Sequence, residues 1–149
     1  MNFDSPASGT DNEGPMELTL AFLADAANLS EGGKLNVLGM FNRIYSDTFP
    51  YRHPSMTCVV RFTASPAEFG KPKEVELTIM DSDGKPLGTL RGQTTVPTPL
   101  DGKRAYVELI LGLNGIPFER PGDYQFAILV GGEEKGSIPF EVTQRPRPS

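Results

Sequence analysis

The stretch Pro121-Gly-Asp-Tyr-Gln-Phe-Ala-Ile-Leu-Val130 carries an aromatic or β-branched residue at every second position from Tyr124 onward. Successive side chains of a β-strand point to opposite faces, so this alternation predicts a strand with one buried face. The Pro-Gly pair ahead of the strand predicts a turn. In immunoglobulin-like domains a tyrosine just after such a turn hydrogen-bonds back to the backbone, and we expect this of Tyr124. A plain core aromatic is the alternative interpretation of the same residue.

Most of the chain follows the same two-residue period. Seven further segments are predicted as strands by this pattern: 17–27, 34–46, 56–63, 74–81, 87–96, 104–113 and 138–143. Turn residues separate them at intervals typical of a sandwich. The sequence therefore predicts an all-β, immunoglobulin-like antiparallel β-sandwich of about eight strands. Ser65 followed by Pro66 and Glu68 predicts at most a short helical turn near residues 65–69, with Ser65 as its N-cap.

The pattern also predicts details within these segments. In the first strand, four apolar residues are expected to share one face: Leu18, Leu20, Phe22 and Ala24. The segment Val37-Leu-Gly-Met-Phe41 is apolar on both faces, and its Gly39 is the expected site of a β-bulge. The proline-bounded segment 49–54 is predicted to be a loop.

The composition excludes several classes of protein. The chain has 149 residues, enough for one domain, and its 16 glycines and 14 prolines disfavour a long helical bundle. The net charge is −5 and no window is rich in lysine and arginine, which argues against binding to nucleic acid or to an anionic membrane surface. The sequence shows no signal peptide or apolar span, and its single cysteine allows no disulfide within the chain. We therefore expect a cytoplasmic protein.

Three parts are predicted along the chain. Residues 1–15 are too polar to bury enough surface to offset the entropy of ordering them, so we expect a disordered leader. Residues 16–143 form the predicted sandwich domain. Residues 144–149 are rich in proline and arginine and are predicted to be a flexible tail.

Four segments together resemble a known family. They are residues 18–28 (LTLAFLADAAN), 33–39 (GKLNVLG), 53–62 (HPSMTCVVRF) and 121–126 (PGDYQF). The chain resembles an uncharacterised bacterial family of small β-sandwich domains of unknown function, over nearly all of the predicted domain. The resemblance implies a fold and a bacterial source, and it implies no activity.

The sequence contains no complete catalytic constellation. A Ser-His-Asp triad would have to use His53, which is the only histidine, and no Gly-x-Ser-x-Gly motif is present. Cys58 alternates with apolar residues, so we expect an inert core thiol. One histidine and one cysteine do not make a zinc site, and no cofactor is predicted.

Two polar residues follow the apolar part of the first strand. Asp25 has apolar neighbours and could act as a desolvated general base, with Lys34 or Arg61 as partner. The alternative is structural, because such a carboxylate more often caps a turn or accepts backbone N–H groups. We expect the structural role for both Asp25 and Asn28.

The segment Asp81-Ser-Asp-Gly84 has the opening spacing of a calcium loop. The loop motif fails further on, where Lys85 and Gly92 occupy the positions of acidic ligands, and a hairpin turn explains the segment. A calcium site built from several loops remains an alternative.

The best candidates for a binding surface are Arg43, Tyr45, Tyr51, Arg52 and His53. Arginine, tyrosine and histidine combine apolar area with directed hydrogen bonds, as interface anchors do. We therefore expect a non-catalytic protein-interaction or accessory module that binds a protein partner or self-associates through an edge strand. The alternatives are a sandwich that holds a carbohydrate or calcium in its end loops, and an enzyme of unfamiliar chemistry.

Overall fold

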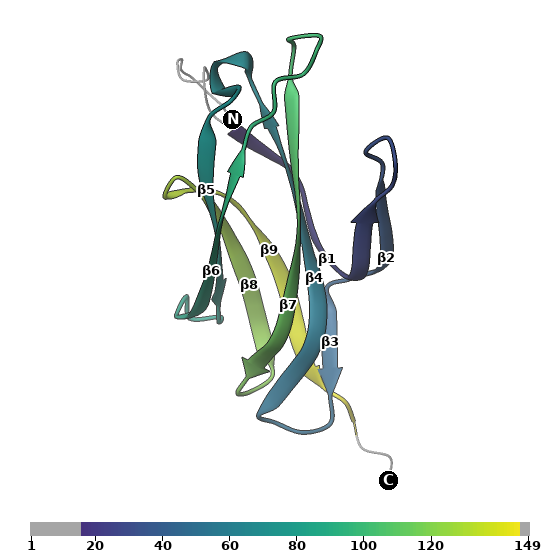
Figure 1. The fold of residues 1–149 in the computed structure, drawn as a ribbon. Coiled ribbons are helices and arrows are strands. Elements are labelled where there is room, and N and C mark those ends of the chain that lie inside the picture. The colour runs from purple at the N-terminus through teal and green to yellow at the C-terminus, as the bar shows by residue number, and fades with distance from the viewer. Residues whose placement is uncertain (1–15, 147–149) are drawn as a thin grey trace.

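The computed structural model describes residues 16–146 as two stacked β-sheets (Figure 1). Nine strands make up the two sheets: β1 (Met16–Leu29), β2 (Leu35–Phe41), β3 (Arg43–Ser46), β4 (Tyr51–Ala64), β5 (Pro72–Met80), β6 (Pro86–Thr95), β7 (Ala105–Phe118), β8 (Gly122–Val130) and β9 (Glu133–Gln144). The four-stranded sheet has the order β2-β1-β4-β7, and the five-stranded sheet has the order β3-β9-β8-β5-β6. All neighbouring strands are antiparallel except β3 and β9. The predicted immunoglobulin-like β-sandwich is confirmed.

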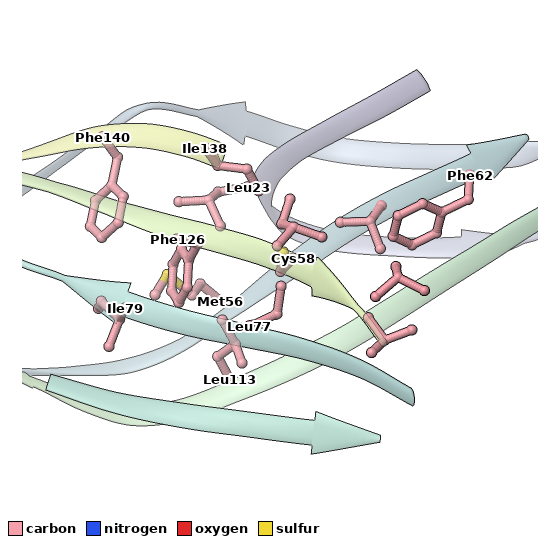
Figure 2. Close-up of a cluster of buried hydrophobic side chains, with 14 of the residues drawn as sticks. Leu23, Met56, Cys58, Phe62, Leu77, Ile79, Leu113, Phe126, Ile138 and Phe140 are labelled. Atoms are coloured by element: carbon pink, nitrogen blue, oxygen red, sulfur yellow. The ribbon is translucent and has the colours of Figure 1, made fainter. Parts of the chain in front are cut away.

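The core lies between the two sheets, where alternate residues of both sheets meet (Figure 2). Phe118 of β7 is fully buried, and its ring lies edge-on to Tyr124 of β8, with 5.0 Å between ring centroids, and to Phe140 of β9. The Tyr124 hydroxyl donates a hydrogen bond of 2.6 Å to the Arg120 carbonyl oxygen, four residues back. The backward hydrogen bond predicted from the Pro-Gly-x-Tyr motif is therefore present.

The prediction of one strand over 34–46 is wrong. The chain leaves the four-stranded sheet at the end of β2 and enters the five-stranded sheet as β3, which pairs in parallel with β9. Asn42 lies at the crossing, and its carbonyl oxygen accepts a hydrogen bond from the Glu141 N–H. Phe41 at the end of β2 and Ile44 of β3 both pack into the core, and they are three residues apart, so the two-residue period breaks at this crossing.

The predicted loop over 49–54 is also corrected, because β4 begins at Tyr51. Residues 51–53 pair with the end of β7, for example Tyr51 with Phe118 and His53 with Ile116. Pro54 and the facing Gly115 form no ladder pair, since proline lacks an N–H and Gly115 has a φ of +65°. Proline is therefore tolerated here as a local interruption of a long strand.

The two faces of β1 differ from the expectation. A β-bulge lies between Leu18 and Leu20, so residues before and after it have opposite alternation. Leu18 packs against the core, and Leu23 lies fully buried within it, whereas Leu20, Phe22 and Ala24 are not part of the core cluster. Gly39 marks no bulge, because the pairing of β1 with β2 keeps one register on both sides of it. Its φ of +71° explains the glycine instead, and the Asp25 carboxylate lies where a Cβ would be.

The helical turn near 65–69 is a three-residue 3-10 turn, Pro66–Glu68. Ser65 makes no side-chain cap, and its buried Oγ has no hydrogen-bond partner among the described residues. Glu68 is the buried polar group of this turn: its carboxylate forms an ion pair with Lys73 at the start of β5. The turn is thus held by this pair and by backbone hydrogen bonds.

The predicted domain boundaries stay predictions. The leader, residues 1–15, and residues 147–149 lie outside the described residues. At the other boundary, β9 includes Gln144, and the Arg145 N–H donates a hydrogen bond of 2.8 Å to the Ser46 carbonyl oxygen. The first two residues of the predicted tail are therefore held by β3. Within residues 16–146 no helix has the length and apolar character needed to span a membrane.

Candidate functional site

Most of the predicted surface residues lie around one hollow of about 330 Å³, where the chain crosses between the sheets. Its polar lining comes from β1, β3, β4 and the residue that follows β9: Asp25, Arg43, Tyr45, His53 and Arg145. We call this the crossing hollow. Arg43 and Tyr45 reach it because they are two residues apart on β3 and share a face.

Hydrogen bonds order the wall of the crossing hollow. The Tyr51 hydroxyl lies 3.0 Å from His53 Nδ1, and Arg43 Nε donates a 2.8 Å hydrogen bond to Glu141 Oε1. Arg52 does not line the hollow: its guanidinium donates a 2.7 Å hydrogen bond to the Gly115 carbonyl oxygen. The structure therefore brings Arg43, Tyr45 and His53 together, with Tyr51 bonded to His53, and separates Arg52 from them.

Asp25 and Asn28 lie on the β1–β2 hairpin. Neither Lys34 nor Arg61, the two predicted partners, pairs with Asp25. Arg61 binds Glu108 instead, and no hydrogen bond or ion pair to the Asp25 carboxylate occurs among residues 16–146. Asn28 instead accepts a 3.0 Å hydrogen bond from the Asn36 amide across the hairpin. Asp25 and His53 line the same hollow, but no hydrogen bond joins them.

Burial lowers the pKa of His53, and the nearby Asp25 carboxylate opposes this shift only in part. His53 is the only histidine of the chain, and histidine is the side chain whose ordinary pKa lies closest to neutral pH. A lowered pKa in the folded state means that the unfolded chain binds more protons once the pH falls below about 6.5. We predict that the free energy of unfolding declines between pH 7.5 and 5.5.

Chemical denaturation of the protein and of His53→Gln at both pH values tests this prediction. The decline should be smaller in the variant, because glutamine does not titrate. An equal decline in both proteins would assign the effect to other groups.

Cys58 is not placed to act as a nucleophile. Its thiol is fully buried in the core, and burial raises the pKa of Cys58 to about 12. Because the thiolate is the reactive form, a thiol reagent should modify the folded protein only through unfolding. We predict that labelling in water is slow and that denaturant accelerates it in step with the unfolded fraction; fast labelling in water would contradict this burial.

The candidate calcium segment forms a hairpin turn between β5 and β6. One Asp81 carboxylate oxygen accepts hydrogen bonds of 3.0 Å from both the Asp83 and the Lys85 backbone N–H. This carboxylate thus stabilises the turn. Among residues 16–146, no three histidine, cysteine or acidic side chains gather in a way that could hold a metal ion.

A second surface, which sequence reasoning missed, covers the face of the four-stranded sheet that points away from the core. Cross-strand pairing places apolar residues of all four strands there, among them these six: Leu20, Phe22 and Ala24 of β1, Met40 of β2, Val59 of β4 and Ile110 of β7. We call this set the outer apolar face. None of the six belongs to the core cluster. Met40 is 68% exposed, whereas Val59 and Ala24 are fully buried.

The opposite surface of the sandwich, on the five-stranded sheet, is polar. There Arg91 Nε donates a 2.9 Å hydrogen bond to Glu76, and the hydroxyls of Thr78 and Thr89 lie 3.2 Å apart. Antiparallel sheets commonly keep one such solvated face. The outer apolar face of the four-stranded sheet departs from this rule. The sequence signal for this face was that β1 has apolar residues at both odd and even positions, and the bulge between Leu18 and Leu20 decides which of them point outward.

The fold and these surfaces define a small immunoglobulin-like β-sandwich domain with one apolar outer face. The chain belongs to a family of unknown function (DUF6941), whose model matches residues 19–143. This confirms the resemblance to an uncharacterised family of small β domains. No curated protein matches the sequence.

Three solved structures are similar to this chain at low sequence identity. An immunoglobulin-like protein from Pseudomonas aeruginosa is 13% identical with a TM-score of 0.41, and the match covers 87% of this chain and 93% of that one. A Listeria innocua β-glucosidase in complex with isofagomine is 9% identical with a TM-score of 0.50, covering 88% and 16%. The Pseudomonas fluorescens alkylpurine DNA glycosylase AlkC, bound to abasic-site DNA, is 12% identical with a TM-score of 0.48, covering 86% and 30%. This chain spans under a third of the two enzymes.

Proposed function

We propose that this domain is a non-catalytic protein-interaction module that binds through the outer apolar face. The observation that carries the proposal is the position of Phe22, Met40 and Ile110 on a sheet face with no second sheet over it. An apolar face on a small domain costs solubility, and such faces typically mark sites where another protein docks.

A photo-crosslinking residue placed at position 40 tests this function in cells that naturally make the protein. Met40 is well exposed, so the substitution removes little packing within the domain. The matched control is position 89, because Thr89 is exposed on the polar outer face of the five-stranded sheet. We expect one protein adduct of defined mass from position 40 and none from position 89.

A second change makes the test specific for the face. Ile110→Thr keeps a β-branched side chain in β7 but replaces apolar area with a hydroxyl. The adduct from position 40 should weaken strongly in this background if β2 and β7 contact the same partner. Equal adducts from positions 40 and 89, or none from either, would overturn the proposed function.

A further inference from the structure

We propose that the partner of the outer apolar face is a second copy of this chain, packed face to face so that two four-stranded sheets form the centre of a symmetric dimer. This inference rests on the proposed function. A two-fold interface uses the same patch on both copies, so the patch must be complementary to itself in charge and shape. The two requirements can be tested on the structure.

The charges on this face cancel within each copy. Arg61 of β4 and Glu108 of β7 point outward beside the apolar residues, and Arg61 Nε donates a 2.9 Å hydrogen bond to Glu108 Oε2. Glu17 at the beginning of β1 and Arg52 at the beginning of β4 are the remaining charges with this orientation, and they have opposite signs. Two copies that each carry a net charge of −5 would repel elsewhere, but here they can meet without burying an unpaired charge at the centre.

The size and shape of the face also suit a second copy. Strands β4 and β7 are each 14 residues long. With 14 residues in each of β1, β4 and β7 and 7 in β2, a strand spacing of about 4.8 Å and a rise of roughly 3.3 Å per residue give a face of roughly 800 Å², against about 800 Å² per partner in a standard interface. No atom lies within 4 Å of the position that a Cβ would occupy at Gly112 of β7. The residues paired across the strands beside it, Thr57 and Ala24, are small. The face is therefore flat enough for a second sheet to pack at about 10 Å.

Pairing through the edge strand β2 is less favoured. Gly39 lies in the middle of β2 with a φ of +71°, which interrupts the extended backbone that a partner strand would need. The face of the sheet has no such interruption between Leu20 and Ala24. The structure thus disfavours the addition of a partner strand at β2.

Analytical ultracentrifugation of the full chain tests the dimer. We expect a species of twice the 16.2 kDa chain mass at micromolar concentration. Met40→Glu should weaken the dimer by at least about 30-fold, the effect of losing an interface hot spot, because it places a charge in the apolar contact. Leu100→Glu is the matched control: Leu100 is fully exposed in the β6–β7 loop, and this variant should dimerise as the unchanged protein does.

Thermal unfolding of both variants shows whether they are folded, and Ile110→Thr provides a second disruption of the face. A dimer that resists both Met40→Glu and Ile110→Thr would overturn the inference, as would a monomer at all concentrations. The crosslinking experiment separates the two proposals. An adduct from position 40 with twice the chain mass supports both; an adduct with a different protein overturns the dimer and leaves the interaction function standing.

Discussion

Replacement of Phe118 by alanine is expected to lower the free energy of unfolding by about 3–5 kcal/mol. Phe118 is fully buried at the end of β7, and it contacts Tyr124 and Phe140 edge-on. The change removes the buried ring, leaves a cavity and ends two aromatic contacts worth about 0.5–1.5 kcal/mol each. Chemical denaturation monitored by circular dichroism measures the difference.

The control for this variant is Leu100→Ala. Leu100 is apolar but fully exposed, so its truncation should change the free energy of unfolding by less than about 0.5 kcal/mol. A loss below about 1.5 kcal/mol in Phe118→Ala would mean that the site collapses around the missing ring or that the ring is not packed as described.

Lys73→Met is expected to cost about 3 kcal/mol, because it leaves the Glu68 carboxylate buried without its closest cation. Only 6% of the Glu68 side chain is exposed, and Lys71, the other nearby cation, lies 3.9 Å away and is itself largely exposed. Methionine preserves most of the apolar stem of lysine, so the loss reports the charge. Denaturant titrations at neutral pH measure it.

The double variant Glu68→Gln with Lys73→Met separates the charge from the shape. Removing both charges takes away the buried carboxylate, so the double variant should recover most of the stability lost in the single one. If the single and double variants are equally destabilised, the cost lies in lost packing at the start of β5 rather than in an uncompensated charge.

Much of the fold could be predicted from particular residues. The alternation of Tyr124, Phe126 and Ile128 predicted β8, and the turn ahead of it predicted the hydrogen bond from Tyr124 to Arg120. These features are local, so a two-residue period and turn chemistry are enough to indicate them.

The candidate site was predictable only in part. Arg43, Tyr45 and His53 were singled out by residue type, and the structure places them around one hollow. Arg52 was grouped with them because it is adjacent in sequence, yet neighbouring residues of a strand point to opposite sides. Because residues 51–53 belong to β4 and not to a loop, Arg52 points away from Tyr51 and His53.

The apolar pattern was enough to indicate the class of structure, because apolar residues at every second position bury their side chains when pleated sheets pack on each other. It could not determine which sheet each strand joins or which face of β1 is buried. The crossing at Asn42 and the bulge beside Leu18 decide these points, and each depends on partners distant in the chain. A one-residue shift exchanges the faces of a strand, so only the tertiary structure could place Phe22 outside the core, on the surface where we expect a second copy to bind.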